Sequence, residues 1–305
     1  MSLLCKSPYM KGVIPCGCGQ CKPCLINRRR TWTHRLMLEA FTHEENAFVT
    51  LTYEKEPEGA TLVPSDVQEW LKRLRFRIAP RRVRYYLAGE YGETTERPHY
   101  HVALFGYPTC SRGRTEHRLS TCCEPCNTIK TTWGHGGVDL GELELKSAQY
   151  IAGYVTKKMT NPNNPRVRAW LKGRHPEFSR MSLRPGIGAF AMDQVVASIK
   201  TVDGLVKSLD DVPNFLQHGM KKLPLGRYLR RQLREKLGRS KDTPRAAIET
   251  FLAELQGLRQ QFLQENSDLP SAFKDPKSQF MKENVQRFRN FEAREKIFGQ
   301  QRSVL

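Results

Sequence analysis

Residues 97–105 read Arg-Pro-His-Tyr-His-Val-Ala-Leu-Phe, and this stretch decides how the middle of the chain folds. Its aromatic and apolar side chains predict a strand, in which successive side chains point to opposite faces. His99 and His101 therefore share one face, while Tyr100, Val102 and Leu104 take the other. Two imidazoles about 6–7 Å apart along a strand can converge on one metal ion. The alternative is a surface strand with two solvated histidines.

A second strand is predicted immediately upstream, over residues 83–90, which are rich in β-branched and aromatic side chains. The loop from residue 91 to residue 97 is short, so the two strands are expected to be antiparallel neighbours. This pairing places Glu90, at the end of the first strand, close to His99. Glu90 is thus the candidate third ligand beside the two histidines.

A helix predicted over residues 147–159 carries another set of reactive side chains. At about 100° per residue, one third of its circumference holds Tyr150, Tyr154, Lys157 and Lys158. An apolar stripe lies roughly 130° away and consists of Ala148, Ile151, Ala152, Val155 and Met159. A core helix would mix its tyrosines with the aliphatic residues, whereas here phenols and amines have a face of their own. The alternative is an amphipathic helix with tyrosines at its edge.

Together these motifs resemble a known family. A strand with His-hydrophobic-His, followed by a helix with Tyr-x-x-x-Tyr-x-x-Lys, is similar to the HUH endonucleases that start rolling-circle DNA replication. Over roughly residues 1–190 the chain resembles the replication initiators of small single-stranded DNA phages, the gokushovirus group of the Microviridae. Four motifs carry the resemblance in this order: residues 48–53, 89–92, 97–101 and 181–188.

The resemblance implies an α+β, HUH endonuclease fold with a central, mostly antiparallel sheet in a split βαβ arrangement, flanked by helices. We predict three regions from the sequence. Residues 1–45 form a cysteine-rich, zinc-binding knuckle and a basic helix, and residues 46–200 form the endonuclease core with a cysteine-rich insertion at 108–128. Residues 201–305 are expected to be a helical C-terminal appendage that takes no part in the chemistry.

The resemblance also implies metal-dependent transesterification at an origin of replication. The metal, Mg²⁺ or Mn²⁺, would be held by the two histidines and Glu90 and would polarise the phosphate. A tyrosine would attack and give a 5′-phosphotyrosyl link and a free 3′-OH primer, before the strand is rejoined. Lys157 matches the lysine of the family motif, and Lys158 is its substitute.

The chain is strongly basic, with 50 Lys and Arg against 31 Asp and Glu and a formal net charge of +19. This excess indicates a polyanionic partner, usually nucleic acid, although a basic structural protein would share it. The resemblance implies single-stranded DNA and the supercoiled replicative-form origin as partners, with host helicase and polymerase. The candidate DNA-binding residues, otherwise solvated surface charges, are Arg28, Arg29, Arg30, Arg73 and Arg77.

Membrane and export signals are not evident in the sequence. No run of 18 apolar residues occurs, so no membrane span is predicted. The N-terminal residues lack the basic-then-apolar order of a signal peptide. We therefore expect the protein in the host bacterial cytoplasm.

Nine cysteines fall into two groups, and an odd number in a reducing compartment favours metal thiolates over disulfides. In the first group Cys18, Cys21 and Cys24 form two overlapping Cys-x-x-Cys pairs, the spacing of a structural Zn²⁺ site. Cys5 can supply the fourth ligand, and Cys16 is its rival. Free thiols are the alternative.

The second group lies in the insertion, and its spacing is less regular. Cys110, Cys122 and Cys126 can be joined by either Cys123 or His117 to hold a second zinc. Such a site would clip a DNA-contacting loop in place. The sequence leaves this interpretation level with that of free thiols.

Other classes of protein share parts of this pattern. Two histidines and a carboxylate also describe a non-haem iron oxygenase, but that chemistry has no use for the +19 charge or the Tyr/Lys face. A non-catalytic, zinc-containing DNA-binding protein could use the tyrosines only to stack bases. Within the HUH group, a relaxase or a transposase matches the surrounding motifs less well.

Overall fold

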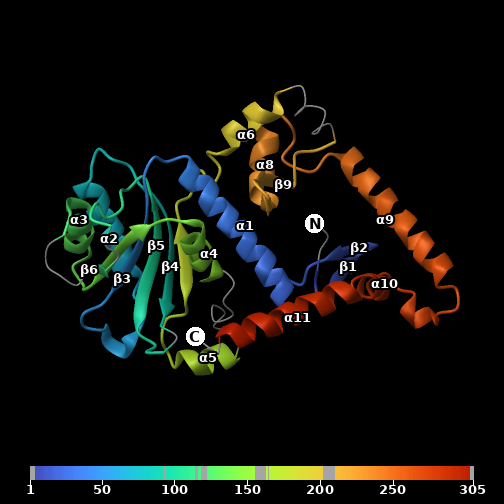
Figure 1. The fold of residues 1–305 in the computed structure, drawn as a ribbon, viewed down its shortest axis with the longest axis horizontal. Helices are drawn as coiled ribbons and strands as arrows, with labels where there is room; N and C mark the ends of the chain where they lie inside the picture. Colours follow the sequence, from blue (N-terminus) through green and yellow to red (C-terminus); the bar gives the residue numbers. More distant parts are fainter. Residues whose placement is uncertain are drawn as a thin grey trace. The chain divides into compact units, whose positions relative to one another are not determined.

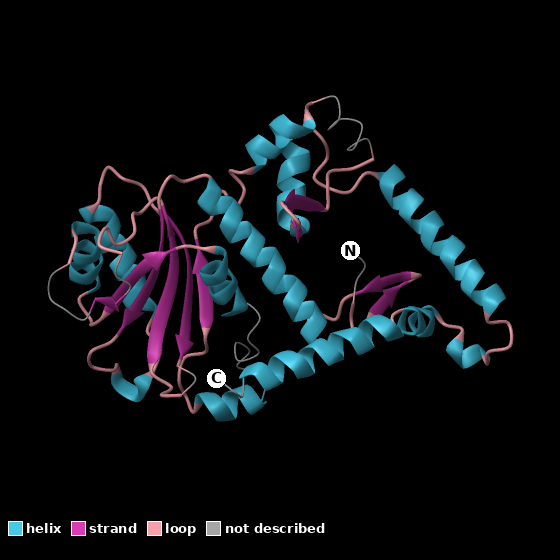
Figure 2. Ribbon diagram, viewed as in Figure 1, coloured by secondary structure: helices cyan, strands magenta, loops and turns pink. Residues whose placement is uncertain are grey.

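The computed structural model describes residues 4–92, 94–113, 116–117, 122–154, 163, 165–201 and 210–302, which form two compact units (Figures 1 and 2). The sheet unit comprises Arg28–Ser208 and Val212–Lys241. The hairpin unit comprises Met1–Asn27, Leu209–Asp211 and Asp242–Leu305. Residues 201–305, drawn from the sequence as one region, are therefore divided between the two units.

A six-stranded sheet is the centre of the sheet unit, and every pair of neighbouring strands in it is antiparallel. β3 and β4 both pair with β5, which lies between them, so β3 and β4 run parallel to each other. The connection from β3 through α2 to β4 is thus a split βαβ unit, as expected. In spatial order the strands are β6 (Glu116–His117), β7 (Val138–Glu142), β3 (Asn46–Thr52), β5 (Pro98–Phe105), β4 (Arg84–Tyr91) and β8 (Phe178–Met181).

Helices cover both faces of the sheet, and alternation along β5 decides which core each side chain enters (Figure 1). Tyr100, Val102 and Leu104 pack in one core with α2 (Pro64–Arg77), α3 (Glu124–Trp133) and α5 (Pro165–Leu171). Ala103 and Phe105 pack in the other core with α1 (Lys22–Phe41) and α4 (Leu145–Tyr154). The predicted alternation is confirmed, and so is the α+β class with a central antiparallel sheet flanked by helices.

The rest of the sheet unit adds a third core against α1. It is built by α6 (Met192–Ile199), the antiparallel hairpin of β9 (Phe215–His218) and β10 (Lys221–Pro224), and α8 (Gly226–Lys236). Leu225, Leu229 and Leu233 are fully buried there with Leu38 of α1. The hydroxyl of Tyr228 accepts a hydrogen bond of 2.7 Å from the Gly186 amide, which ties α8 to the turn after β8. Part of the expected C-terminal appendage is thus integral to the sheet unit.

This third core predicts where the chain can be shortened. A fragment of residues 28–241 should unfold in one cooperative transition, whereas a fragment of residues 28–200 should show none. The shorter fragment lacks three fully buried leucines, each worth about 2–5 kcal/mol, against a total stability of about 5–15 kcal/mol for a domain. Thermal unfolding followed by circular dichroism compares the two. Equal midpoints would contradict the packing described.

The hairpin unit has a small two-stranded sheet and a helical part. Strands β1 (Tyr9–Lys11) and β2 (Ile14–Cys16) form an antiparallel hairpin that packs against α10 (Pro276–Glu283). The Asp275 side chain caps α10 by accepting from the amides of Lys277 and Ser278 at 2.8 and 3.1 Å. The remaining elements are α9 (Arg245–Glu265), the 3₁₀ turn η3 (Ser271–Phe273) and α11 (Val285–Arg302), and a further 3₁₀ turn, η1 (Glu58–Ala60), lies in the sheet unit.

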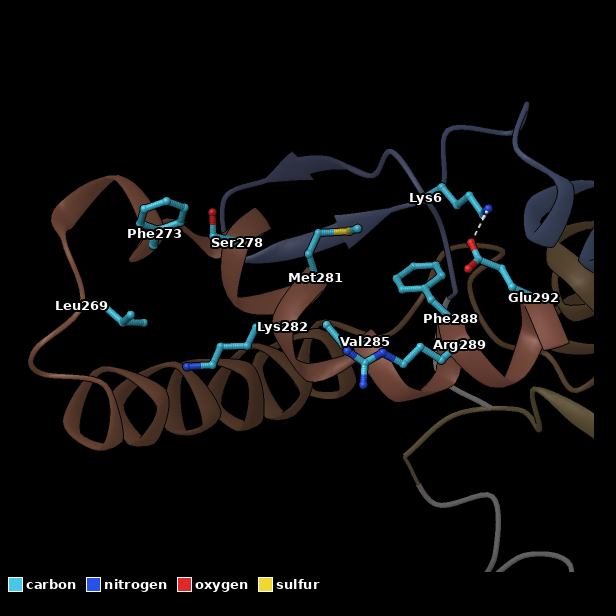
Figure 3. A pocket seen from close by; sticks show the side chains of 10 residues that line it. All are labelled: Lys6, Leu269, Phe273, Ser278, Met281, Lys282, Val285, Phe288, Arg289 and Glu292. Atoms are coloured by element: carbon cyan, nitrogen blue, oxygen red, sulfur yellow. Dashed lines mark hydrogen bonds and ion pairs between the residues drawn. The ribbon is translucent and has the colours of Figure 1, made fainter.

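A mainly apolar pocket of about 610 Å³ lies in the hairpin unit, along α10 and α11 (Figure 3). At one end Lys6 pairs with Glu292 of α11 at 2.8 Å. The apolar lining is Leu269, Phe273, Met281, Val285 and Phe288. Across the part of the chain that the structure describes, no helix combines the length and the apolar character that crossing a membrane requires.

Candidate active site

Glu90, His99 and His101 converge on the α4 side of the sheet. The β4–β5 register pairs Glu90 directly with His99, and His101 follows two residues along β5 on the same face. The Oε1 atom of Glu90 lies 2.8 Å from Nε2 of His99 and 3.0 Å from Nε2 of His101. Glu90 and His101 are buried, and His99 is partly buried. The adjacency of Glu90 and His99 predicted from the short loop is confirmed.

The hydrogen bonds on the far side of each ring show what this arrangement accommodates. Nδ1 of His99 lies 3.1 Å from the Arg97 carbonyl oxygen, which can only accept, so Nδ1 carries the proton. In neutral His99 the Nε2 lone pair would then face a carboxylate oxygen, which is repulsive unless a positive charge lies between them. Two imidazole nitrogens and one carboxylate, each oriented by a further partner, are the donor set and support of a divalent-metal site.

Two residues missed in the sequence hold His101 in place. Thr50 Oγ1 lies 3.0 Å from Nδ1 of His101, opposite it in the β3–β5 register. Phe48 stacks on one side of the imidazole, with centroids 5.5 Å apart and planes 18° apart. Tyr154 stacks at 5.8 Å and 12°. The alternation Phe-x-Thr-x-Thr in β3 puts these side chains on one face, but only the strand register places them beside His101.

Tyr150 and Tyr154 both lie at this site. The Tyr150 hydroxyl is 3.4 Å from Glu90 Oε1 and 3.4 Å from His101 Nε2, and the residue is 47% exposed. Tyr154 is 9% exposed, and its ring lies edge-on to that of Tyr150 with centroids 5.1 Å apart. Burial, with hydrogen bonding to Glu90 and Tyr150, raises the pKa of Tyr154 well above its usual range. Both phenols are therefore neutral at physiological pH, and neither is nucleophilic without activation.

The local sequence explains how α4 presents these phenols. Ala148, Ile151 and Ala152 are fully buried in the core shared with α1, which fixes the rotation of the helix. Tyr150 falls on the exposed side of that stripe, and Tyr154 at its border. The two candidate lysines, Lys157 and Lys158, lie outside the described residues.

The candidate DNA-binding arginines occupy different surroundings. Nε of Arg29 donates to the Gln149 carbonyl oxygen at 2.8 Å, immediately before Tyr150, so Arg29 links α1 to α4. Nη2 of Arg30 donates to the Lys222 carbonyl at 2.9 Å. Arg73 donates to the Thr132 and Trp133 carbonyls at the end of α3 at 2.8 and 3.3 Å, a structural use of its guanidinium. The side chains of Arg28 and Arg77 are exposed.

The first cysteine group is also assembled, within the hairpin unit. The sulfur atoms of Cys5, Cys18, Cys21 and Cys24 all lie within 4.8 Å of one another. Cys21 Sγ is 3.7 Å from Cys5 Sγ, and the amides of Gln20 and Cys21 donate to Cys18 Sγ at 3.4 and 3.3 Å. Cys16, the rival ligand, is not part of this group. Four convergent sulfurs with amide donors match the donor set of a zinc knuckle.

Comparison with known proteins places this geometry in a class. Residues 46–159, which include the sheet strands β3, β5 and β4 and the tyrosine helix, match the family model of the replication-associated protein ORF2. No solved structure matches the chain. The site and the match together define a replication-associated protein domain.

The relatives are bacteriophage and virus proteins. Replication-associated protein VP4 of Bdellovibrio phage phiMH2K is 31% identical over 161 residues, covering 48% of this chain and 50% of that protein. Replication-associated protein ORF4 of Chlamydia phage 1 is 29% identical, covering 47% and 38%, and Replication-associated protein ORF2 of Spiroplasma virus 4 is 31% identical, covering 47% and 48%. The chain thus spans half or less of the length of these relatives. The resemblance to phage replication initiators is confirmed.

Proposed function

We propose that this chain is a replication initiation endonuclease of the HUH type, which nicks single-stranded DNA at a phage origin. The observation that carries this proposal is the convergence of His99, His101 and Glu90 within 3.4 Å contacts of a half-exposed tyrosine hydroxyl. A purely DNA-binding protein has no use for a buried carboxylate between two imidazoles. The likeness to replication-associated proteins supports a role in replication initiation.

In the proposed reaction the phenolic oxygen of Tyr150 forms a bond to phosphorus and the bond to the 3′-oxygen breaks. The phenol loses its proton and the departing 3′-oxygen gains one, so the products are a 5′-phosphotyrosyl ester and a 3′-OH. Glu90 and His101 orient the hydroxyl of Tyr150, and the ring stack of Phe48 and Tyr154 fixes the plane of His101. A bound Mg²⁺ or Mn²⁺, held by Glu90, His99 and His101, would supply charge stabilisation at the phosphate.

The ester retains the energy of the cleaved bond, so the reverse reaction can rejoin the strand without ATP. The 3′-OH would prime synthesis by a host polymerase, with a host helicase opening the duplex, inside the host bacterial cell. Binding of single-stranded DNA and of the supercoiled origin would draw on the net charge of +19, through residues such as Arg28 and Arg77. The lysine expected at position 157 would stabilise charge on the phosphate.

The direct test incubates the protein with circular single-stranded DNA and Mn²⁺. The expected product is a linear strand with the protein covalently attached to its 5′ end, resistant to boiling in detergent and lost after protease treatment. Nicked DNA with free ends on both sides, or binding without cleavage, would contradict the proposal.

We also propose that the first cysteine group holds structural zinc through Cys5, Cys18, Cys21 and Cys24. Protein purified without chelator should contain zinc, and Cys21→Ser with Cys24→Ser should remove one zinc per chain. Because structural zinc contributes directly to folding free energy, the variant should also lose protease resistance in the hairpin unit. Elemental analysis measures the metal. Cys16→Ser is the matched control and should change neither quantity, since its sulfur lies outside the group.

A further inference from the structure

The second cysteine group lies at the junction of a loop and a helix in the sheet unit. Cys110 comes from the segment after β5, Cys122 and Cys123 precede α3, and Cys126 lies in the first turn of α3. All nine cysteines lie in the described part of the chain, and none of them forms a disulfide. The sulfur atoms of these four lie within 4.8 Å of one another, and Cys110 and Cys126 are buried.

The separations between these sulfur atoms fit a tetrahedral ion. Cys110 Sγ lies 3.6 Å from Cys122 Sγ and 3.8 Å from Cys123 Sγ, and Cys123 Sγ lies 3.3 Å from Cys126 Sγ. Four thiolates at about 2.3 Å from one Zn²⁺ would be about 3.8 Å apart. A pair of disulfides would bring the sulfurs together two by two. Here Cys110 and Cys123 each contact two other sulfurs, so all four surround one point.

The backbone around the sulfurs is held independently of them. Cys123 is the N-cap residue of α3, so the positive end of the helix dipole faces the group and favours thiolates. The Asn127 side chain brackets Cys122, accepting from its amide at 3.0 Å and donating to its carbonyl at 3.3 Å. Tyr107 donates its hydroxyl to the Pro125 carbonyl at 2.8 Å. The ligands are thus positioned by contacts that do not involve sulfur.

We propose that Cys110, Cys122, Cys123 and Cys126 bind one Zn²⁺, the second zinc of the chain. On binding at neutral pH, each thiol loses a proton, and a single tetrathiolate centre with a net charge of −2 replaces four thiols. The sequence left His117 open as the fourth ligand, and the geometry points to Cys123. This zinc is separate from the divalent ion of the proposed nicking reaction and does not depend on it.

The zinc would fix a wall of the pocket next to His101. Thr109, Cys110 and Gly113 line a pocket of about 490 Å³ together with Phe48 and Thr50, the two residues that hold His101. By clipping Cys110 to the start of α3, the zinc holds this loop over the edge of β3. We therefore assign it a positioning role for the segment that borders the candidate active site.

The test counts zinc in the full chain by native mass spectrometry, after expression in zinc-supplemented medium and purification without chelator. We expect two zinc ions in the wild type and one in Cys122→Ser with Cys126→Ser. Cys21→Ser with Cys24→Ser should also retain one, and Cys16→Ser should retain two. A wild type whose zinc is all lost in the Cys21/Cys24 variant would overturn the proposal, as would a Cys122/Cys126 variant with the wild-type count.

A second measurement covers the case in which the serine variant does not fold. Alkylation of the native wild type, followed by peptide mapping, should leave Cys110, Cys122, Cys123 and Cys126 unmodified until a chelator is added, while Cys16 reacts at once. Reaction of the four thiols without chelator would overturn the proposal. A mass deficit of 2 or 4 Da in the denatured chain, the mark of disulfides, would do so too. Neither readout depends on nicking activity.

Discussion

Replacing His101 with alanine should lower the rate of DNA nicking by about 10³-fold or more and leave single-stranded DNA binding nearly unchanged. Metal charge stabilisation is worth several kcal/mol, and each 1.36 kcal/mol is about tenfold in rate. His101 contacts Glu90 and Tyr150, so its loss removes a metal ligand and a partner of the proposed nucleophile at once. Binding rests mainly on phosphate contacts by Lys and Arg, which do not require the ion.

The measurement pairs a nicking assay on an origin oligonucleotide with fluorescence anisotropy at several salt concentrations. His99→Ala should behave like His101→Ala, because its Nε2 atom faces the same carboxylate oxygen. His135→Ala is the matched control and should nick at the wild-type rate, since its exposed ring lies against Trp133 and Tyr53, away from the metal ligands. If His101→Ala nicks DNA as fast as the wild type, the metal assignment is wrong.

The second large effect concerns the two tyrosines. Tyr150→Phe and Tyr154→Phe should each still form a covalent protein–DNA adduct, and the double variant should form none. Initiation leaves the first tyrosine esterified while a full circle is copied, so cutting the regenerated origin requires another phenol. Tyr150 and Tyr154 are one helical turn apart at the same site, which suits alternation. Tyr150→Phe should be the slower single variant, because Tyr150 is the more exposed of the two.

Phenylalanine keeps the ring contacts with His101 and removes only the hydroxyl, so these variants should fold normally. Tyr85→Phe, on β4 and packed against the opposite core, is the control and should form the adduct at the wild-type rate. Peptide mapping identifies the esterified residue. Adduct found only on Tyr154, with complete turnover in Tyr150→Phe, would refute alternation while leaving the endonuclease proposal in place.

Local patterns predicted the part of the site that depends on neighbours in sequence. The His-x-His alternation, the short loop that brings Glu90 opposite His99, and the i, i+4 spacing of the tyrosines are all properties of one strand, one hairpin or one helix. These features therefore appear in the structure much as predicted. The chemical roles of the residues remain proposals.

The features that were missed depend on pairing between distant segments. Thr50 and Phe48 reach His101 only because β3 pairs with β5 in one register, and a shift by one residue would turn both away. Val212–Lys241 joins the sheet unit because its leucines fill a core against α1, which no local pattern reveals. Arg73 looked like a surface charge, yet its guanidinium binds the last carbonyls of α3.

The hairpin unit has a consequence for how the chain is made. Its β1–β2 hairpin packs on α10, and Lys6 pairs with Glu292, so segments from opposite ends of this sequence must meet. During synthesis the hairpin and its cysteines emerge first, and α10 follows only about 250 residues later, roughly 13–50 s at bacterial and eukaryotic translation speeds. Every strand of the sheet unit leaves the ribosome within that interval. The sheet unit can therefore fold during translation, while the hairpin waits for its helical partner until α10 and α11 have been synthesised.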